Sequence, residues 1–300
     1  MKYFVTGVSG QLGHDLVDEL LKRGDEVIGS DRGDDHPWGD QKAYRHIPLD
    51  LTDQARVMEV LDLEKPECLF HCAAWTAVDL AEEEENIPKV EAVNVKATGY
   101  LAEACKKNDI KMIYISTDYV FDGQGEEPWK ADDKNYAPIN VYGRTKLEGE
   151  LEVASKLDKY FIVRIAWVFG VNGNNFVKTM LKVGKSYPEV RVVNDQIGTP
   201  TYTYDLARLL VDMSKTEKYG YYHATNEGGY ISWYDFVVEI YRLAGYETKV
   251  TPVTTEEYGL SKAKRPKNSR LDKSRLVEEG FEPLPLWQDA VARYLKTIGY

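Results

Sequence analysis

Hydrophobic and polar positions alternate between two patterns over about the first 165 residues. Short apolar runs, such as Tyr3–Val5 and Met112–Ile115, are typical of buried strands. Longer amphipathic stretches lie between them, and leucines at 12, 16 and 20, with Leu21 beside the last, recur every four positions, as on one face of a helix. This alternation predicts successive βαβ units, and therefore a parallel sheet covered by helices.

The pattern predicts the following elements in this part of the chain. Strands are expected over residues 3–5, 25–30, 68–72, 112–115 and 160–165, and helices over 12–21, 52–63, a long segment ending near 107, and 140–156. Thr52 is a natural N-cap for its helix, and Pro66 follows the end of that helix.

The pattern loosens after residue 166. Helices are expected over 203–213 and 232–244, a loop over 170–175, and a polar, irregular region over 251–269. The predicted fold class is therefore α/β, a Rossmann-type doubly wound parallel sheet with a smaller C-terminal α+β region. We expect residues 1–166 to form one domain, with further sheet elements from about 190–225, and residues 167–300 to form mainly a second region, whose loops over the strand ends are suited to binding.

Three glycines in the turn after the first strand indicate a dinucleotide site. Gly7, Gly10 and Gly13 allow a tight turn, a close approach of the backbone to a pyrophosphate, and packing of helix on strand. The helix start also offers free N–H groups to an anion. The spacing is G-x-x-G-x-x-G rather than G-x-G-x-x-G and arises by chance in roughly one such chain in eight, so the prediction depends on the strand–turn–helix context.

The residues at the end of the second strand bear on the type of nicotinamide cofactor. Asp31 stands about 20 residues after the glycines, where a carboxylate can bind the adenosine ribose of NAD. Arg32 follows it, and a guanidinium there can hold the 2′-phosphate of NADP. Both NADH and NADPH therefore stay open, and Asp31 alone is also compatible with a simple turn residue.

Composition excludes several classes of partner. The chain has 300 residues with a net charge of −11 and lacks a basic stripe that would bind nucleic acid. The first strand follows Met1 directly, and no stretch approaches the 18 or more apolar residues of a membrane span, so a cytoplasmic protein with no membrane contact is expected.

Side chains that bind metals show no metal-binding pattern. The three cysteines, Cys68, Cys72 and Cys105, are expected to be core thiols, and the five histidines form no spaced ligand set. The acidic run Glu82–Glu85 is expected to be a solvated face or a helix start. No metal ligand is assigned.

Tyr142 and Lys146 carry the predicted chemistry. They lie four positions apart at the start of a helix, so both side chains share one face near the carboxyl edge of the sheet. Chance predicts about two Tyr-x-x-x-Lys pairs, and the second pair, Tyr258 and Lys262, lies in the irregular region. An ammonium and an oxidised nicotinamide both stabilise a phenolate, so Tyr142 could donate a proton to a carbonyl oxygen as hydride arrives. The alternative is a surface helix pair.

A hydroxyl at the end of the strand over 112–115 is expected to hold the substrate carbonyl. Thr117 is preferred to Ser116, although strand alternation points the two to opposite faces and the sequence does not decide between them. The alternative is a turn at a strand end.

Five motifs are spread over the whole chain. They are Gly7-x-x-Gly10-Gln11-Leu12-Gly13, Ala73-Ala74-Trp75-Thr76-Ala77-Val78-Asp79, Ser116-Thr117-Asp118-Tyr119-Val120-Phe121-Asp122-Gly123, Tyr142-Gly143-x-x-Lys146-x-x-Gly149-Glu150 and Arg265-Pro266-x-Asn268-Ser269-x-Leu271-Asp272. Together they resemble the motifs of the dTDP-4-dehydrorhamnose reductases, which are extended short-chain dehydrogenases. Trp75 departs from the Tyr or His more usual at its position.

The resemblance implies reduction of a 4-keto sugar nucleotide at C4, the last step of dTDP-L-rhamnose synthesis, with NADPH or NADH. It makes Thr117, Tyr142 and Lys146 the catalytic set. It assigns Gly10, Gln11 and Leu12 to the pyrophosphate, Asp50 and Leu51 to the adenosine side, and Ala74, Trp75 and Thr76 to the nicotinamide side. With the residues identified above, the expected cofactor-binding set is Gly7, Gly10, Gln11, Leu12, Gly13, Asp31, Arg32, Asp50, Leu51, Ala74, Trp75, Thr76, Tyr142 and Lys146. The resemblance gives Thr76, Val78, Tyr119 and Trp167 as contacts of the dTDP-linked 4-keto-6-deoxy sugar, to which we add Thr117, Asp118, Arg265 and Asn268. Residues 1–166 are therefore expected to form the NAD(P)-binding domain, and residues 167–300 to be mainly substrate-binding.

Several alternatives stay open at this point. Arg265 and Lys267 offer cations to the sugar-nucleotide pyrophosphate but also fit a basic surface loop. The same fold serves sugar-nucleotide epimerases and dehydratases that retain NAD, and the non-catalytic, NADP-binding regulatory subunit of methionine adenosyltransferase. Some family members carry Mg²⁺ at a dimer contact, so the resemblance alone leaves Mg²⁺ and a homodimer open.

Overall fold

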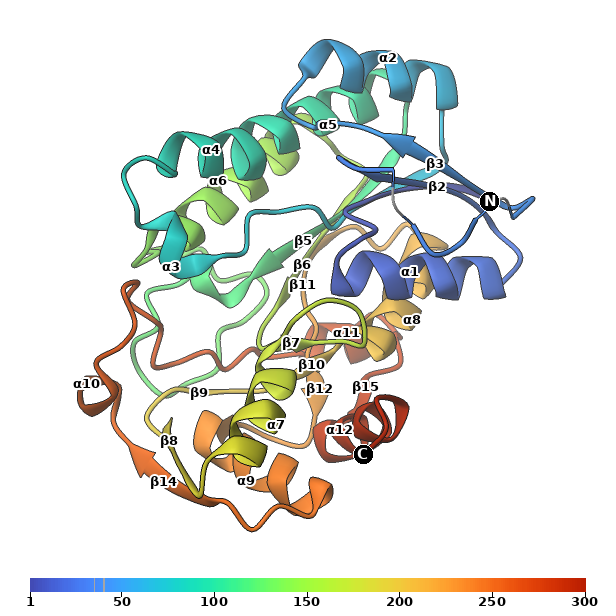
Figure 1. The fold of residues 1–300 in the computed structure, drawn as a ribbon. Helices are drawn as coiled ribbons and strands as arrows, with labels where there is room; N and C mark the ends of the chain where they lie inside the picture. The colour runs from blue at the N-terminus through green and yellow to red at the C-terminus, as the bar shows by residue number, and fades with distance from the viewer. Residues whose placement is uncertain (35, 40) are drawn as a thin grey trace.

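A seven-stranded parallel sheet forms the centre of the molecule in the computed structural model, which describes residues 1–34, 36–39 and 41–300 (Figure 1). Its strands, in spatial order, are β11 (Gly220–His223), β6 (Tyr160–Ile165), β5 (Lys111–Thr117), β4 (Cys68–His71), β1 (Lys2–Thr6), β2 (Glu26–Asp31) and β3 (Tyr44–Pro48). The order reverses between β1 and β4. Ligands of doubly wound folds bind at the carboxyl edge of such a switch point.

Helices cover both faces of this sheet, which confirms the doubly wound α/β class (Figure 1). One face carries α1 (Gln11–Lys22) and α8 (Thr203–Ser214), and the other carries α2 (Gln54–Glu64), α5 (Ala97–Lys107) and α6 (Val141–Lys156). Each layer encloses its own hydrophobic core, so the strands are apolar on both sides. Shorter turns precede α5 and α6: α3 (Val78–Ala81), α4 (Ile87–Glu91), the π-helical turn Ala92–Lys96 and the 3₁₀ turn Asp118–Val120.

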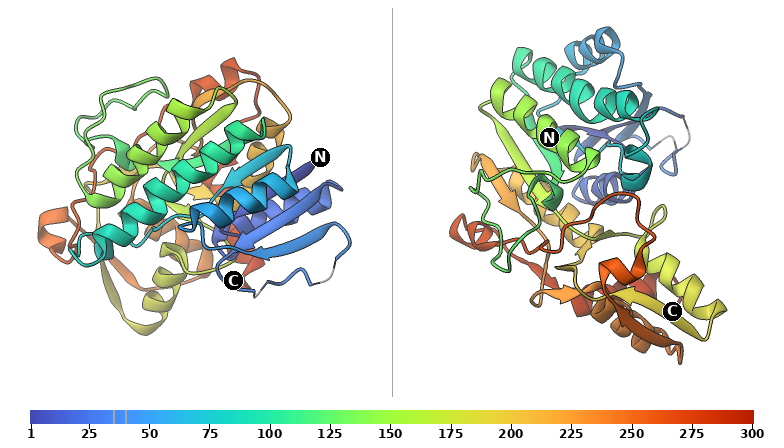
Figure 2. Two further views of the ribbon diagram at one scale, coloured as in Figure 1. Left: turned by 90° about the horizontal axis from the view of Figure 1, so that it is seen from above. Right: turned by 90° about the vertical axis from the view of Figure 1, so that its left-hand side faces the viewer.

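A smaller lobe lies beyond the carboxyl edge of the sheet, and Figure 2 shows it set apart in its right-hand view. A third core packs helices α7 (Phe176–Ser186), α9 (Trp233–Ala244) and α12 (Trp287–Thr297) together. The remaining elements of the whole chain, of which α11 packs against the core of the large sheet, are β7 (Val168–Phe169), β8 (Glu189–Val193), β9 (Ile197–Gly198), β10 (Thr201–Tyr202), β12 (Asn226–Glu227), β13 (Ile231–Ser232), β14 (Lys249–Val253), α10 (Thr255–Tyr258), α11 (Ser274–Glu278) and β15 (Leu284–Leu286).

Four local predictions differ from the structure. Asp53, not Thr52, is the N-cap of α2, because its carboxylate accepts the Arg56 N–H at 3.0 Å while Thr52 donates to Asp50. Strand β3 has too weak an alternation to be predicted. The region 251–269 contains part of β14 and all of α10, and the long helix ending at Lys107 is interrupted by the π-helical turn.

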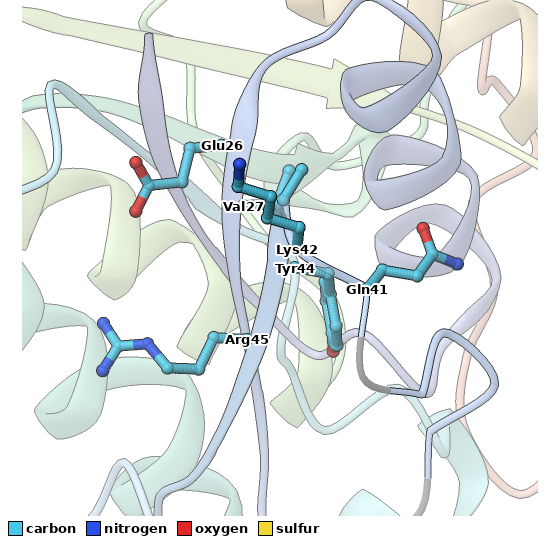
Figure 3. A pocket seen from close by; sticks show the side chains of 7 residues that line it. Glu26, Val27, Gln41, Lys42, Tyr44 and Arg45 are labelled. Carbon is cyan, nitrogen blue, oxygen red and sulfur yellow. The ribbon is translucent and has the colours of Figure 1, made fainter.

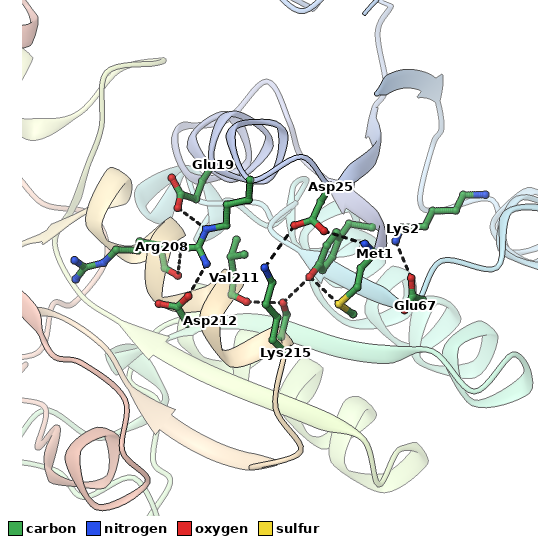
Figure 4. Close-up of polar contacts among 12 residues, drawn as sticks. Met1, Lys2, Glu19, Asp25, Glu67, Arg208, Val211, Asp212 and Lys215 are labelled. Atoms are coloured by element: carbon green, nitrogen blue, oxygen red, sulfur yellow. Dashed lines mark hydrogen bonds and ion pairs between the residues drawn. The ribbon is translucent and has the colours of Figure 1, made fainter. Parts of the chain in front are cut away.

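Polar contacts fasten the amino edge of the sheet, opposite the carboxyl edge where the functional residues gather (Figure 4). Arg23 at the end of α1 donates to Glu19 at 2.6 Å and to Asp212 of α8 at 2.5 Å. Asp25 accepts from the Met1 amino group at 2.9 Å and faces Lys215 at 3.8 Å. These contacts join the ends of α1 and α8 to each other and to the residue before β2.

A fully buried ion pair joins α6 to the strands beside it. The Arg164 guanidinium on β6 donates to both oxygens of Glu150, at 2.9 and 2.8 Å, and neither side chain is exposed. The same guanidinium donates to the Tyr136 hydroxyl at 3.0 Å and lies 5.0 Å from the centre of the Phe121 ring. The pair therefore fixes α6 and the segment around 121–136 to one strand.

Replacing one member of this pair is expected to destabilise the fold strongly. The Glu150→Gln variant keeps the shape but leaves the Arg164 charge buried and unpaired, which costs about 3–5 kcal/mol of unfolding free energy. Urea denaturation at neutral pH measures it. The matched control is Asp109→Asn in the exposed pair with Lys159, where no measurable loss is expected. Equal, small losses in both variants would contradict this role of the buried pair.

Candidate functional site

The glycine turn at the end of β1 is shaped by close contacts between backbones. Gly7 has φ +72°, and a Cβ added there would lie 2.8 Å from the Ala73 nitrogen. A Cβ on Gly13 would lie 2.2 Å from the Gly7 carbonyl oxygen. Gly10 is the N-cap of α1 and has no side chain to cap it, so the N–H groups of the first turn of α1 are available to an anion. The turn therefore suits a pyrophosphate.

The ends of β2 and β3 lie next to this turn. The Asp31 carboxylate accepts the Ser9 N–H at 3.2 Å and the Arg32 N–H at 2.8 Å, so it also fixes the glycine turn. Asp50 accepts the Thr52 N–H at 2.9 Å, and the hydrogen bonds from Thr52 hold the pKa of the Asp50 carboxyl below its usual range. The Leu49 N–H donates to the Asp31 carbonyl at 2.8 Å, which brings the predicted adenosine-side residues together.

The segment after β4 passes over the glycine turn through the contact of Ala73 with Gly7. Its predicted nicotinamide-side residues are Ala74, Trp75 and Thr76, and Thr76 is exposed. The backbone of Trp75 is held by the side chain of Asn94, which accepts the Trp75 N–H at 2.8 Å and donates to its carbonyl at 3.2 Å. Sequence reasoning missed Asn94; a buried amide in a helical stretch was its only signal.

Thr117, Tyr142 and Lys146 gather where β5 ends and α6 begins. The Asn140 side chain caps α6 by accepting the Gly143 N–H at 2.7 Å. A Cβ on Gly143 would lie 2.3 Å from the Tyr119 carbonyl oxygen, so the first turn of α6 packs directly on the turn after β5. The Tyr119 and Tyr142 rings meet edge to face with centres 5.6 Å apart. The Ser116 hydroxyl is buried and lacks a hydrogen-bond partner among the described residues, whereas Thr117 contacts Tyr142.

Burial dominates the electrostatics of this cluster. It raises the pKa of the Tyr142 phenol above its usual value, and the hydrogen bond with Thr117 opposes that rise. It also lowers the pKa of the Lys146 ammonium to about 7. Lys146 donates to the Ile115 carbonyl at 2.7 Å and lies 4.1 Å from the centre of the Tyr114 ring. The expected stabilisation of the Tyr142 phenolate therefore requires a movement of this ammonium or the charge of the cofactor.

Asp118 lies beside Thr117 and is almost completely buried. It accepts a hydrogen bond from the Thr117 hydroxyl at 3.0 Å. Burial raises the pKa of the Asp118 carboxyl to about 6, although hydrogen bonds from Ser269 and Thr117 lower it. This carboxyl is therefore poised to change its charge near neutral pH.

The C-terminal segment 263–268 crosses this edge and contributes Arg265 and Asn268. Arg265 donates to Asp79 at 2.7 Å through Nη2, while its Nη1 is buried and has no partner among the described residues. The Asn268 amide instead donates to the carbonyls of Gln124 and Glu127, at 3.2 and 2.8 Å. Within the described part of the chain, Arg265 thus has a free donor, whereas the Asn268 amide group holds the neighbouring loop.

Trp167 has an unusual backbone and a covered ring face. Its φ is +50°, in the left-handed region that bulky residues rarely adopt. Its indole stacks on Trp233 of α9 with ring centres 3.7 Å apart, and Phe176 contacts the Trp233 ring in turn. One face of Trp167 is therefore occupied by protein.

Val78, another predicted substrate contact, begins α3 and is half-buried.

The acidic run Glu82–Glu85 is less solvated than predicted, because its first two carboxylates have protein partners. Glu82 accepts the Val141 N–H at 2.7 Å, at the start of α6, and Glu83 pairs with Lys262 at 3.1 Å. The second Tyr-x-x-x-Lys pair therefore places its lysine in an ion pair with the α3–α4 turn. Cys68 and Cys105 are buried free thiols, as predicted, and Cys72 is half-buried.

Metal-binding clusters, membrane-spanning helices and hollows away from the carboxyl edge are further features that can indicate function. Within residues 1–34, 36–39 and 41–300, no three His, Cys, Asp or Glu side chains come together as metal ligands do. Over the same ranges, every helix is too short or too polar to span a membrane. A hollow of about 320 Å³ lies at the amino ends of β2 and β3, lined by side chains including Glu26, Tyr44 and Arg45 (Figure 3). It is remote from the carboxyl edge.

Comparison with known proteins assigns the family. Residues 1–299 match the family model described as the RmlD substrate binding domain. The dTDP-4-dehydrorhamnose reductase of Streptomyces griseus is 38% identical over 99% of this chain and 94% of its own length. Among solved structures, the dTDP-4-dehydrorhamnose reductase of Clostridium acetobutylicum superposes with a TM-score of 0.88 at 39% identity, covering 100% of both chains. That of Bacillus anthracis, in complex with NADP, has a TM-score of 0.87 at 37% identity, covering 99% of each. The chain therefore belongs to the RmlD substrate binding domain family, and its resemblance to the dTDP-4-dehydrorhamnose reductases is confirmed.

Proposed function

We propose that this protein is an NAD(P)H-dependent oxidoreductase that reduces the C4 keto group of dTDP-4-dehydro-L-rhamnose to give dTDP-L-rhamnose. The observation that carries the proposal is the cluster of Thr117, Tyr142 and Lys146 at the same sheet edge as the uncapped glycine turn. Relatives that match over nearly their whole length are named as reductases of this sugar nucleotide. The reaction is the last step of dTDP-rhamnose synthesis.

The glycine turn fits the pyrophosphate of a nicotinamide dinucleotide because a side chain at Gly7 or Gly13 would meet backbone atoms. In this proposal residues 1–166 bind the cofactor, through Gly7, Gly10, Gln11, Leu12 and Gly13 at the pyrophosphate, Asp31, Arg32, Asp50 and Leu51 on the adenosine side, and Ala74, Trp75 and Thr76 on the nicotinamide side. Residues 167–300 mainly bind the substrate. The strand β11, at residues 220–223, extends the sheet of the first part.

The bound nicotinamide supplies the hydride. In the structure the Thr117 hydroxyl donates its proton to Asp118; with substrate bound it would turn that proton to the C4 carbonyl oxygen, and Tyr142 would give the same oxygen its phenolic proton. With the cofactor bound, Lys146 would hold the nicotinamide ribose in place of the Ile115 carbonyl, and its ammonium would stabilise the phenolate left on Tyr142. The buried site makes each of these interactions stronger than it is in water.

The sugar nucleotide is bound mainly by the loops between the two lobes. The buried Nη1 of Arg265, which lacks a partner among the described residues, is directed to its pyrophosphate as a charge-assisted donor. Thr76, Val78, Asp118 and Tyr119 line the sugar side, and Trp167 contributes through its uncovered ring face or edge because Trp233 covers the other face. We place the enzyme in the cytoplasm, where both NADH and NADPH are available to it.

Cofactor consumption is the first test. Purified protein is expected to oxidise NADPH or NADH when given the dTDP-linked 4-keto-6-deoxy sugar, and to do so more slowly with the UDP-linked analogue. An epimerase or dehydratase would change the sugar while leaving the nicotinamide unconsumed. Cofactor binding with no turnover of either sugar would instead favour a non-catalytic regulatory subunit and contradict the reductase.

The Tyr142→Phe variant is expected to lose turnover while keeping cofactor affinity. Removing the phenolic proton lowers kcat by about 10²–10⁴-fold, since the carbonyl oxygen then lacks its acid. Steady-state kinetics and cofactor titration measure the two quantities. Tyr258→Phe, in the other Tyr-x-x-x-Lys pair, is the matched control and should behave like the parent. Normal turnover by the Tyr142 variant would exclude the assigned role.

The preference between NADPH and NADH tests whether Arg32 binds the 2′-phosphate of NADPH. If its guanidinium binds the 2′-phosphate, Arg32→Ser raises KM for NADPH by about tenfold and leaves KM for NADH unchanged, because one charge-assisted contact is lost. Equal changes for the two cofactors would show that Arg32 does not read the 2′-phosphate.

The raised pKa of Asp118 predicts a pH-dependent stability. Because the folded pKa of about 6 exceeds the unfolded value near 3.8, the unfolding free energy falls as pH rises between these values, by up to about 3 kcal/mol. The Asp118→Asn variant stays neutral, so its stability relative to the parent should increase from pH 4 to about pH 6 and then level off. Urea denaturation across this range measures the difference. A difference that does not vary with pH would contradict the raised pKa.

A further inference from the structure

His71 ends β4 at the centre of the sheet, in register with Thr6 of β1 and Tyr114 of β5. Its side chain is 1% exposed, and its two ring nitrogens contact the hydroxyls of Thr6 at 2.9 Å and Thr98 at 3.0 Å. Burial lowers the pKa of the His71 imidazole to about 3, so the ring is neutral. A neutral imidazole has one donor and one acceptor, and its neighbours decide which nitrogen is which.

The neighbouring hydrogen bonds fix that choice. The Thr98 hydroxyl donates its only proton to the Asn94 carbonyl at 2.8 Å, so it must accept from His71 Nε2. His71 Nδ1 is then the acceptor and receives the Thr6 proton. The Thr6 oxygen in turn accepts the N–H groups of Cys72 and Ala73, each at 3.2 Å. The hydrogen bonds therefore form one series with a single direction, in which Thr6 donates to His71, His71 to Thr98, and Thr98 to the Asn94 carbonyl.

The same series of hydrogen bonds reaches Trp75, at the other end of residues 72–75, through Asn94. Asn94, whose carbonyl accepts from Thr98, also holds the N–H and carbonyl of Trp75 with its side chain. Its amide further donates to the Thr145 hydroxyl at 3.1 Å, and Thr145 donates to the Tyr142 carbonyl at 3.0 Å. Residues 72–75 are thus bound at one end by Thr6 and at the other by Asn94, and His71 joins these two anchors.

We propose that His71 is a positioning residue that sets the conformation of residues 72–75 against the nicotinamide half of the cofactor, through its directed hydrogen bonds to Thr6 and Thr98. The inference rests on the proposed function for the identity of the cofactor. Ala73 contacts the Gly7 backbone, and Ala74 and Trp75 follow it, so a shift at Trp75 changes the space for the nicotinamide ring. Asp31 and Asp50, on the adenosine side, keep their own backbone hydrogen bonds.

The test compares two ligands that differ in the nicotinamide ring. The His71→Leu variant, which removes both hydrogen bonds at similar volume, is expected to bind NADH or NADPH about tenfold more weakly and to bind ADP-ribose or its 2′-phosphate as the parent does. The Thr98→Val variant should show the same selective loss, and Thr98→Ser, which keeps the hydroxyl, should restore parental binding. In steady-state kinetics, the weaker binding is expected to raise the KM for the cofactor, while kcat changes by less than about twofold.

The matched control is Tyr3→Phe, which removes a buried hydrogen bond to Ser214 from the amino end of β1. It is expected to lower thermal stability without changing either affinity. If the His71→Leu variant binds both ligands equally weakly, or both as the parent does, the positioning role is overturned. If the His71→Leu variant does not fold, Thr98→Val carries the same test. Failure of the parent to bind any of these nucleotides would instead refute the proposed function.

Discussion

The close contact between the glycine turn and the segment after β4 is the constraint on which the rest of the site depends. Gly7 touches the Ala73 backbone, and Gly13 touches the Gly7 carbonyl, so neither position tolerates a side chain. This contact lies at the point where the strand order reverses, between β1 and β4. It brings the uncapped end of α1 and the segment 73–76 to one place, and β5 and α6 then add Thr117, Tyr142 and Lys146 beside them.

Two kinds of buried polar contact maintain this arrangement. The Arg164–Glu150 pair fixes α6 to β6, while the directed chain through Thr6, His71 and Thr98 fixes the segment after β4. Both are satisfied on every side, which is the condition under which buried polar groups specify a conformation. Lys146 differs from them: burial lowers its pKa to about 7, and it donates to a backbone carbonyl that a bound ribose could replace.

Local signals in the sequence predicted the parts of the site that local chemistry determines. The glycine turn and the helix that begins near residue 140 and carries Tyr142 follow from short spacings, and the structure has them at those positions. Contacts between distant residues were not predictable, because nothing in a single chain pairs Asn94 with Trp75 or Trp167 with Trp233. The contact of Glu82 was missed because its partner, the Val141 N–H, lies 59 positions away. The left-handed backbone of Trp167 has no sequence signal in a residue that is not glycine.

In the proposed reaction, hydride moves from a nicotinamide to C4 of a dTDP-linked sugar, and Tyr142 is the proton donor. Its most direct measurement uses NADPH or NADH carrying deuterium at the transferred position, with the sugar product analysed by mass and by NMR. We expect one deuterium at C4 of the product for each nicotinamide oxidised, and almost none with the Tyr142→Phe variant. A converted sugar without deuterium, or with the nicotinamide unconsumed, would contradict it.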